Sequence, residues 1–157
     1  MNVMSRLRGA AALAIAGVLG IAAPVTAQQG GLKRVDLELV LAVDISQSMD
    51  QDEHALQRNG YVEAFRHKDV INALVSGPEG RIAVAYMEWA GDFEPIVTIP
   101  WTIIDSDKAA HDFADRLEKE PIFGEQRTSI STALMKATEL IEGNDISLGR
   151  DGIFVNT

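Results

Sequence analysis

The chain contains no cysteine among its 157 residues. A disulfide framework, a zinc site with thiolate ligands and a cysteine nucleophile are therefore excluded. Basic residues are also scarce, because 14 lysines and arginines stand against 23 aspartates and glutamates, for a formal net charge of −9 at pH 7. Such a charge disfavours nonspecific binding to nucleic acid or to an anionic membrane surface. We expect no nucleic acid as a partner, and no membrane once the N-terminal segment is removed.

Patterns typical of hydrolases are missing as well. The sequence has no Gly-x-Ser-x-Gly, the motif that places a serine nucleophile on a sharp turn. Its three histidines, His54, His67 and His111, are scattered along the chain. We expect them at the surface rather than as catalytic bases, and we expect the protein not to be an enzyme.

The first 27 residues have the order of an export signal. Arg6 and Arg8 precede an apolar stretch of small residues at 10–23, and Val25-Thr26-Ala27 offers a cleavage site. The stretch is short for a membrane span, although a retained anchor is the alternative. We expect residues 1–27 to be a signal peptide, residues 28–34 a flexible lead, and the protein to be periplasmic or secreted.

Strand and helix patterns alternate over the remaining residues. Apolar runs predict strands at 35–43, 81–89, 94–103 and 152–156, and helical spacing predicts helices that begin near residues 50, 105 and 130. The first helix is expected to break near 67–69. This order predicts an α/β fold, with a doubly wound, mostly parallel sheet and helices on both faces.

Two local signals refine this scheme. Asp50 and Glu53 have the spacing of a capping box, which begins a helix. Pro100 lies inside the third predicted strand, where a proline indicates an edge strand because it cannot donate a ladder hydrogen bond. Alternation in that strand predicts that Val97, Ile99 and Trp101 share one face.

The sequence Asp44-Ile45-Ser46-Gln47-Ser48 follows the first predicted strand directly. It places one carboxylate and two hydroxyls at the carboxyl end of that strand, where open α/β sheets bind ligands. Hard cations such as Mg²⁺ prefer oxygen ligands of this kind. The alternative is that Asp44 and Ser48 only accept loop amides and cap the next helix.

A second segment, residues 124–134, opens a later helix and contains Thr128 before Ala133-Leu134. Together with the Asp-x-Ser-x-Ser motif, it resembles the von Willebrand factor type A domain and its metal-ion-dependent adhesion site. The resemblance covers residues 35–157. It suggests an exported bacterial subfamily of unknown function.

The resemblance implies a metal site that holds Mg²⁺ or Mn²⁺. Ser46, Ser48 and Thr128 would supply hydroxyl oxygens, and Asp44 would act directly or through water. One coordination position would stay open for an acidic residue of a protein partner. The implied function is an exported, metal-dependent protein-binding domain for adhesion or assembly. Thr128 has an alternative role as a helix cap.

The chain also departs from that family. The family places an aspartate after the fourth strand, whereas residues 152–157 reach the end of the sequence without one. We therefore expect residues 35–157 to be a partial domain, incomplete at the C-terminus. A degenerate module without a metal is one alternative. A magnesium-dependent phosphatase is another, although it needs a second carboxylate where Ser46 stands.

Overall fold

The computed structural model describes residues 31–46, 49–91, 94–122 and 129–157. The predicted signal peptide lies outside these residues. The described elements follow in the order β1 (Lys33–Arg34), β2 (Glu38–Asp44), α1 (Gln51–Arg66), α2 (Lys68–Leu74), β3 (Ile82–Trp89), β4 (Ile96–Ile104), α3 (Asp107–Lys119), α4 (Ile130–Glu142), β5 (Ser147–Leu148) and β6 (Asp151–Asn156). In the described segments, no helix has the length and apolar character needed to cross a bilayer.

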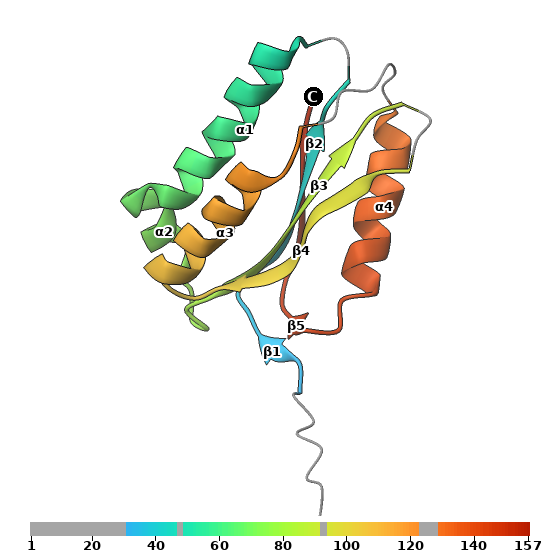
Figure 1. Cartoon of the computed structure of the whole chain (residues 1–157). Coiled ribbons are helices and arrows are strands. Elements are labelled where there is room, and N and C mark those ends of the chain that lie inside the picture. Colours follow the sequence, from blue (N-terminus) through green and yellow to red (C-terminus); the bar gives the residue numbers. More distant parts are fainter. Residues whose placement is uncertain (1–30, 47–48, 92–93, 123–128) are drawn as a thin grey trace, which may run out of the picture. The chain divides into compact units, whose positions relative to one another are not determined.

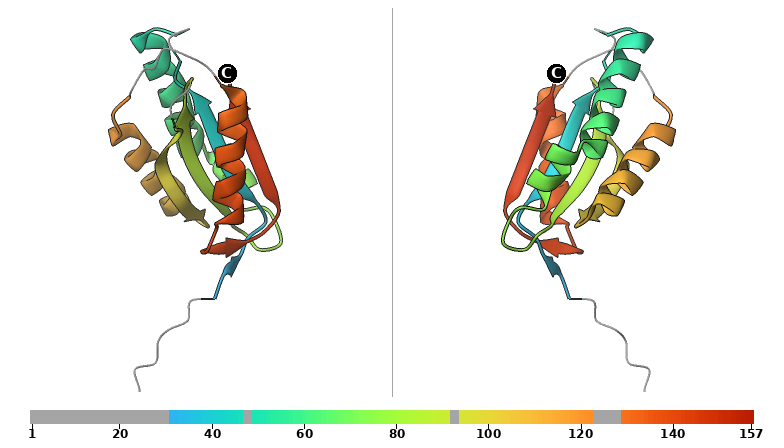
Figure 2. Two further views of the ribbon diagram at one scale, coloured as in Figure 1. Left: turned by 90° about the vertical axis from the view of Figure 1, so that its right-hand side faces the viewer. Right: turned by 90° about the vertical axis from the view of Figure 1, so that its left-hand side faces the viewer.

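The main sheet has the strand order β4-β3-β2-β6 (Figure 1). Strand β2 pairs in parallel with β3 on one side and with β6 on the other, and β4 is antiparallel to β3. Helices α1, α2 and α3 cover one face of the sheet, and α4 covers the other (Figure 2). The fold class is therefore the predicted one: α/β, with a mostly parallel sheet and helices on both faces.

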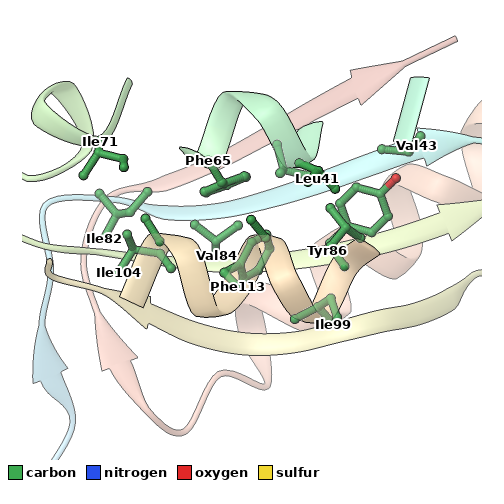
Figure 3. Close-up of a cluster of buried hydrophobic side chains, with 14 residues drawn as sticks. Leu41, Val43, Phe65, Ile71, Ile82, Val84, Tyr86, Ile99, Ile104 and Phe113 are labelled. Carbon is green, nitrogen blue, oxygen red and sulfur yellow. The ribbon is translucent and has the colours of Figure 1, made fainter. Parts of the chain in front are cut away.

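The face under α1 and α3 holds the larger hydrophobic cluster (Figure 3). Phe65 of α1 and Phe113 of α3 meet with ring centroids 4.5 Å apart. Val84 lies beneath them on β3 and is fully buried. Burial of such side chains contributes about 1.5–3 kcal/mol each, so this cluster anchors both helices to the sheet.

The face under α4 holds a smaller cluster. Strand residues Val40, Met87 and Trp89 pack there against Ala133 and Ala137, which are the fully buried side chains of α4. At the margin of this cluster, the Trp101 Nε1 donates to the Leu140 carbonyl over 3.0 Å. Small alanines allow α4 to approach the sheet closely, but they remove less apolar surface from water than the aromatic residues of the other face.

Several local predictions are confirmed. Asp50 caps α1, with its Oδ1 accepting from the Glu53 amide over 2.9 Å, while the Glu53 carboxylate accepts from the Asp50 amide over 2.8 Å. The helix breaks at His67, which also caps α2. Pro100 lies in β4, which is an edge strand of the described sheet.

The predicted common face of Val97, Ile99 and Trp101 is wrong. Ile99 packs in the cluster under α1 and α3, whereas Val97 and Trp101 pack against the cluster under α4. The reason is that the β3–β4 ladder is irregular at two places: Val84 pairs with Thr102, Tyr86 with Ile99 and Met87 with Val97, so β4 has an extra residue on each side of Ile99. An extra residue in one strand reverses the alternation of faces.

A second, two-stranded sheet was not predicted. Residues Lys33 and Arg34, which we assigned to the flexible lead, form β1 and pair in parallel with Ser147 and Leu148 of β5. The Lys33 amide donates to the Ile146 carbonyl over 2.9 Å, and the Val35 amide donates to the Leu148 carbonyl over 3.0 Å. These backbone bonds order the residues that lead into β2.

Candidate functional site

Asp44 is the last residue of β2, the central parallel strand. It pairs in register with Trp89, the last residue of β3, so the two side chains point to the same face of the sheet. The Ile45 amide continues the ladder by donating to the Trp89 carbonyl over 3.0 Å. Asp44 and Ser46 are only 4% and 2% exposed. A carboxylate and a hydroxyl are thus held together, buried, at the carboxyl end of the sheet.

The Asp44 carboxylate organises the loop that follows it. Its Oδ1 accepts from the Ser46 amide over 2.8 Å, and the Ser46 carbonyl accepts from the Met49 amide over 3.3 Å. The alternative role of Asp44, accepting a loop amide, is therefore present in the structure. An ionised carboxylate has two oxygens with about four acceptor positions, so one amide bond leaves capacity for a further ligand.

The two other predicted ligands, Ser48 and Thr128, lie outside the described residues. The helix caps next to them are nevertheless defined. Asp50 caps α1, a role that the sequence allowed for Ser48. Ser129 is the N-cap residue of α4, a role that it allowed for Thr128. The Ser129 hydroxyl lies 2.9 Å from the Thr132 hydroxyl.

The position of Asp44 in the sheet favours a ligand site. β2 lies between β3 and β6 in the sheet. Helix α1, which follows β2, and helix α4, which comes before β6 in the chain, lie on opposite faces of the sheet (Figures 1 and 2). The chain order therefore reverses between β2 and β6. In open α/β sheets, ligands bind in the crevice outside the carboxyl ends of the strands at such a reversal. The start of α4 lies at this same edge (Figure 1).

The donors at this edge fit a hard cation. Among the described residues, no group of three or more histidines, aspartates or glutamates could hold a metal ion. The set implied by the resemblance needs no such group, because it consists of one carboxylate and several hydroxyls. Asp44 and Ser46 supply one oxygen group of each kind, and both kinds suit Mg²⁺ or Mn²⁺.

A groove of about 660 Å³ borders the same edge between α1 and β6. Its walls include Leu56 and Gly60 of α1 and Phe154 of β6, and it extends to Met49 in the loop after β2. At its polar end, Asn156 Nδ2 donates to the Tyr61 hydroxyl over 3.0 Å. Burial raises the pKa of the Tyr61 hydroxyl, so it remains protonated at neutral pH.

The prediction that His54 lies at the surface is wrong. His54 is only 4% exposed, because it lies one turn before Arg58 on the inner face of α1. Its Nδ1 is buried without a hydrogen-bond partner in the described part of the chain, and the same holds for Trp89 Nε1. Buried polar atoms are usually satisfied, so these two are exceptions among the described residues.

Sequence reasoning also missed a buried ion pair. Arg58 of α1 and Glu88 of β3 are 4% and 3% exposed, and an Arg58 Nη2–Glu88 Oε1 hydrogen bond joins them. Arg58 also lies 5.5 Å from the centre of the Tyr86 ring. Burial raises the pKa of the Tyr86 hydroxyl, and the Glu88 charge raises it further. The only sequence signal was a charged residue at an inner position of a helix and another inside an apolar strand.

With fold and site described, the protein is an α/β domain whose candidate site lies at the carboxyl edge of a mostly parallel sheet. The chain belongs to the family described as "Protein of unknown function (DUF1194)", whose model matches residues 34–153. None of the curated proteins matches the chain.

Three solved structures show similarity of fold at low sequence identity. The vWF domain of the type V pili tip protein Mfa5 from Porphyromonas gingivalis is 14% identical, with a TM-score of 0.47, over 76% of this chain and 36% of that chain. A structure of three N-terminal domains of Mfa5 is 14% identical, with a TM-score of 0.49, over 77% and 19%. The pilus adhesin RrgA from Streptococcus pneumoniae is 18% identical, with a TM-score of 0.42, over 77% and 20%. This chain therefore spans little more than a third of the structure of the Mfa5 vWF domain and about a fifth of the other two.

Proposed function

We propose that this protein is an exported, non-enzymatic domain that binds a protein partner through a divalent metal ion. In this proposal the domain is of the von Willebrand factor type A class, and its role is adhesion or assembly. The ion would be Mg²⁺ or Mn²⁺, held by Asp44, Ser46, Ser48 and Thr128. A partner would complete the coordination with an acidic side chain.

The observation that carries the proposal is the position of Asp44 and Ser46. Both are buried at the carboxyl end of the central strand, where the chain order of the sheet reverses. The loop between them is already organised by the 2.8 Å bond from the Ser46 amide to Asp44 Oδ1. A preorganised loop lowers the cost of ordering ligands when the ion binds.

The chemistry of these donors explains why a bound ion would attract a carboxylate. A site with one aspartate and several neutral hydroxyls leaves most of the charge of a divalent ion uncompensated. A bound cation is then the dominant local charge and favours an anionic ligand. The partner's acidic residue supplies that ligand, so affinity for the partner would depend on the ion.

Metal-dependent stabilisation of the full chain tests the site. A ligand that binds only the folded state stabilises it by about 2.7 kcal/mol at a hundredfold excess over its dissociation constant. We expect the melting temperature to be higher with Mn²⁺ than with a chelator. Asp44→Asn should remove most of this difference, because the amide can still accept the Ser46 N–H but carries no charge.

Asp36 provides a matched control at the opposite edge of the sheet. Its carboxylate also accepts backbone amides, from Glu79 over 3.0 Å and from Arg81 over 3.3 Å. Asp36→Asn should lower the melting temperature with and without Mn²⁺ alike. An Asp44→Asn protein that keeps the full Mn²⁺ response would disprove the site. Metal-dependent turnover of a generic phosphate ester would instead favour a phosphatase.

A further inference from the structure

Arg58 joins three elements close to where they meet the carboxyl edge of the sheet. Its Nη2 donates to Glu88 on β3. Its Nη1 donates to the Leu117 carbonyl over 2.9 Å and to the Glu120 carbonyl over 3.1 Å, at the C-terminal end of α3. Arg58 itself lies on α1, about two turns after the first residue of the helix.

Each of these elements is next to a segment of the proposed metal site. Helix α1 begins directly after the loop that carries Ser46. Glu88 pairs in register with Val43, the neighbour of Asp44 in β2. Glu120 is the C-cap residue of α3, and the chain after it leads to Thr128 and α4. The Arg58 contacts therefore link elements that adjoin the two separate ligand segments.

The contacts of Arg58 require an arginine. A guanidinium presents several N–H donors in a rigid, planar fork, whereas a lysine ammonium is a single point of charge on a flexible stem. Here Nη2 donates to a carboxylate, and Nη1 donates to two carbonyls at a helix end. The Leu117 carbonyl also accepts from the Glu120 amide over 3.4 Å, at the C-cap of α3. A side-chain donor at these two carbonyls adds to that cap and helps to fix where α3 ends.

We infer that Arg58, paired with Glu88, is a positioning residue for the proposed metal site. It sets the position of α1, which follows the Asp44–Ser46 loop, relative to β3 and to the C-terminal end of α3, and it would act on the ion through these elements. This role rests on the proposed function and adds to it a residue outside the ligand set. Groups that hydrogen-bond directly to metal ligands change metal affinity by about 10- to 100-fold when they are replaced, and this range sets the scale of the effect expected for Arg58.

The test compares Mn²⁺ affinity and stability in the full chain, with Mn²⁺ alone as the titrant in calorimetry. Arg58→Lys keeps the charge and loses the fork. A double variant, Arg58→Met with Glu88→Gln, removes both charges, so that neither is left buried without a partner. We expect both proteins to bind Mn²⁺ about 10- to 100-fold more weakly than the wild type.

Arg66→Lys is the matched control. Arg66 also joins α1 to α3, through Asp115 and Glu118 over 2.7 Å each, but these groups are exposed. We expect this variant to lose some stability and to keep the wild-type Mn²⁺ affinity. Folded Arg58 variants with wild-type affinity would overturn the positioning role while leaving the metal site intact. A wild type that binds no Mn²⁺ would overturn both.

A measurement on the wild type avoids dependence on how well the variants fold. Coupling between two sites is reciprocal, so an ion that depends on Arg58 must in turn stabilise the contacts of Arg58. We expect Mg²⁺ to slow amide hydrogen exchange at residues 117–122, at the end of α3, and not at 106–110, at its start. Protection confined to the loop after β2 would contradict the inference.

Discussion

Glu38 at the start of β2 accepts a hydrogen bond from the Ser147 hydroxyl of β5 over 2.8 Å. The same carboxylate oxygen accepts from Asn144 Nδ2 over 2.8 Å, and Asn144 in turn donates to the Ser147 hydroxyl over 2.7 Å. The small β1–β5 sheet is thereby tied to the amino end of the main sheet by a buried carboxylate. This polar cluster lies at the edge opposite to the candidate metal site.

Glu38→Gln should change how stability depends on pH. Burial raises the pKa of the Glu38 carboxyl above its ordinary value of 4.5, and the nearby Asp151 raises it further, while the bond from Ser147 opposes the shift. The folded state therefore binds this proton more tightly than the unfolded state. The resulting stability is present below pH 4.5 and is lost as the pH rises through the folded pKa. Urea unfolding from pH 4 to 8 should show the variant gaining stability relative to the wild type as the pH rises.

Two glycines should respond oppositely to alanine. A Cβ at Gly60, on the exposed side of α1, meets no atom within 4 Å, so Gly60→Ala should stabilise the fold by about 1 kcal/mol through helix propensity. A Cβ at Gly149 would lie 2.6 Å from Val35 Cγ2 and 2.7 Å from the Val35 carbonyl oxygen. Gly149→Ala should therefore destabilise by about 1–3 kcal/mol. Chemical denaturation of both variants checks the signs, and a stable Gly149→Ala protein would contradict the close approach of β5 to the chain before β2.

The caps of α1 and α4 should differ in importance. Asp50→Ala removes an acceptor for the Glu53 amide and should cost about 1 kcal/mol. Ser129 caps α4 without a side-chain hydrogen bond to the backbone, so Ser129→Ala should cost less. Thermal melts in a chelator, which exclude effects of metal, provide the comparison. Equal losses for the two variants would contradict a larger contribution from the capping box of α1.

Arg66→Met should weaken the fold more at neutral pH than in acid. The Arg66 guanidinium lowers the pKa of Glu118 and of Asp115 below their ordinary values of 4.5 and 3.8. Their ionised forms therefore contribute stability above those values, and it is lost as the pH falls through the lowered pKa values. Because the groups are exposed, salt should also reduce the difference. Unfolding midpoints at two pH values and two salt concentrations test this, and a difference that persists in acid would point to packing instead.

Local signals predicted most of the main sheet and its helices. The uninterrupted apolar run before Asp44 identified the central strand, because a strand buried on both faces is typically apolar at nearly every position. Pro100 identified the edge strand, because a strand at the edge of a sheet has no neighbour on one side and therefore does not need every backbone N–H as a donor. These features act within a few residues of the chain, so a single sequence reveals them.

The features that the sequence did not reveal depend on distant partners. Arg58 is buried because Glu88 and two carbonyls of α3 satisfy it, and none of these is near it in the sequence. β1 and β5 are two residues each, too short for any periodicity. Ile99 changed face because of an irregular ladder, which depends on how β3 and β4 pair. The Asp44–Ser46 loop was predictable because its motif is contiguous, while its place at the reversal of strand order required the topology.

The unequal cores of the two faces imply unequal resistance to local opening. Helix α3 buries Phe113 and Leu117 completely, whereas the fully buried side chains of α4 are two alanines. Segments with little buried apolar surface open at a lower free energy than the whole domain. Fluctuations that detach α4 would then be more frequent than those that detach α3. An ion bound by ligands from both the β2 loop and the segment before α4 would raise the free energy needed to detach α4. The ion would then stabilise the fold as well as bind the partner.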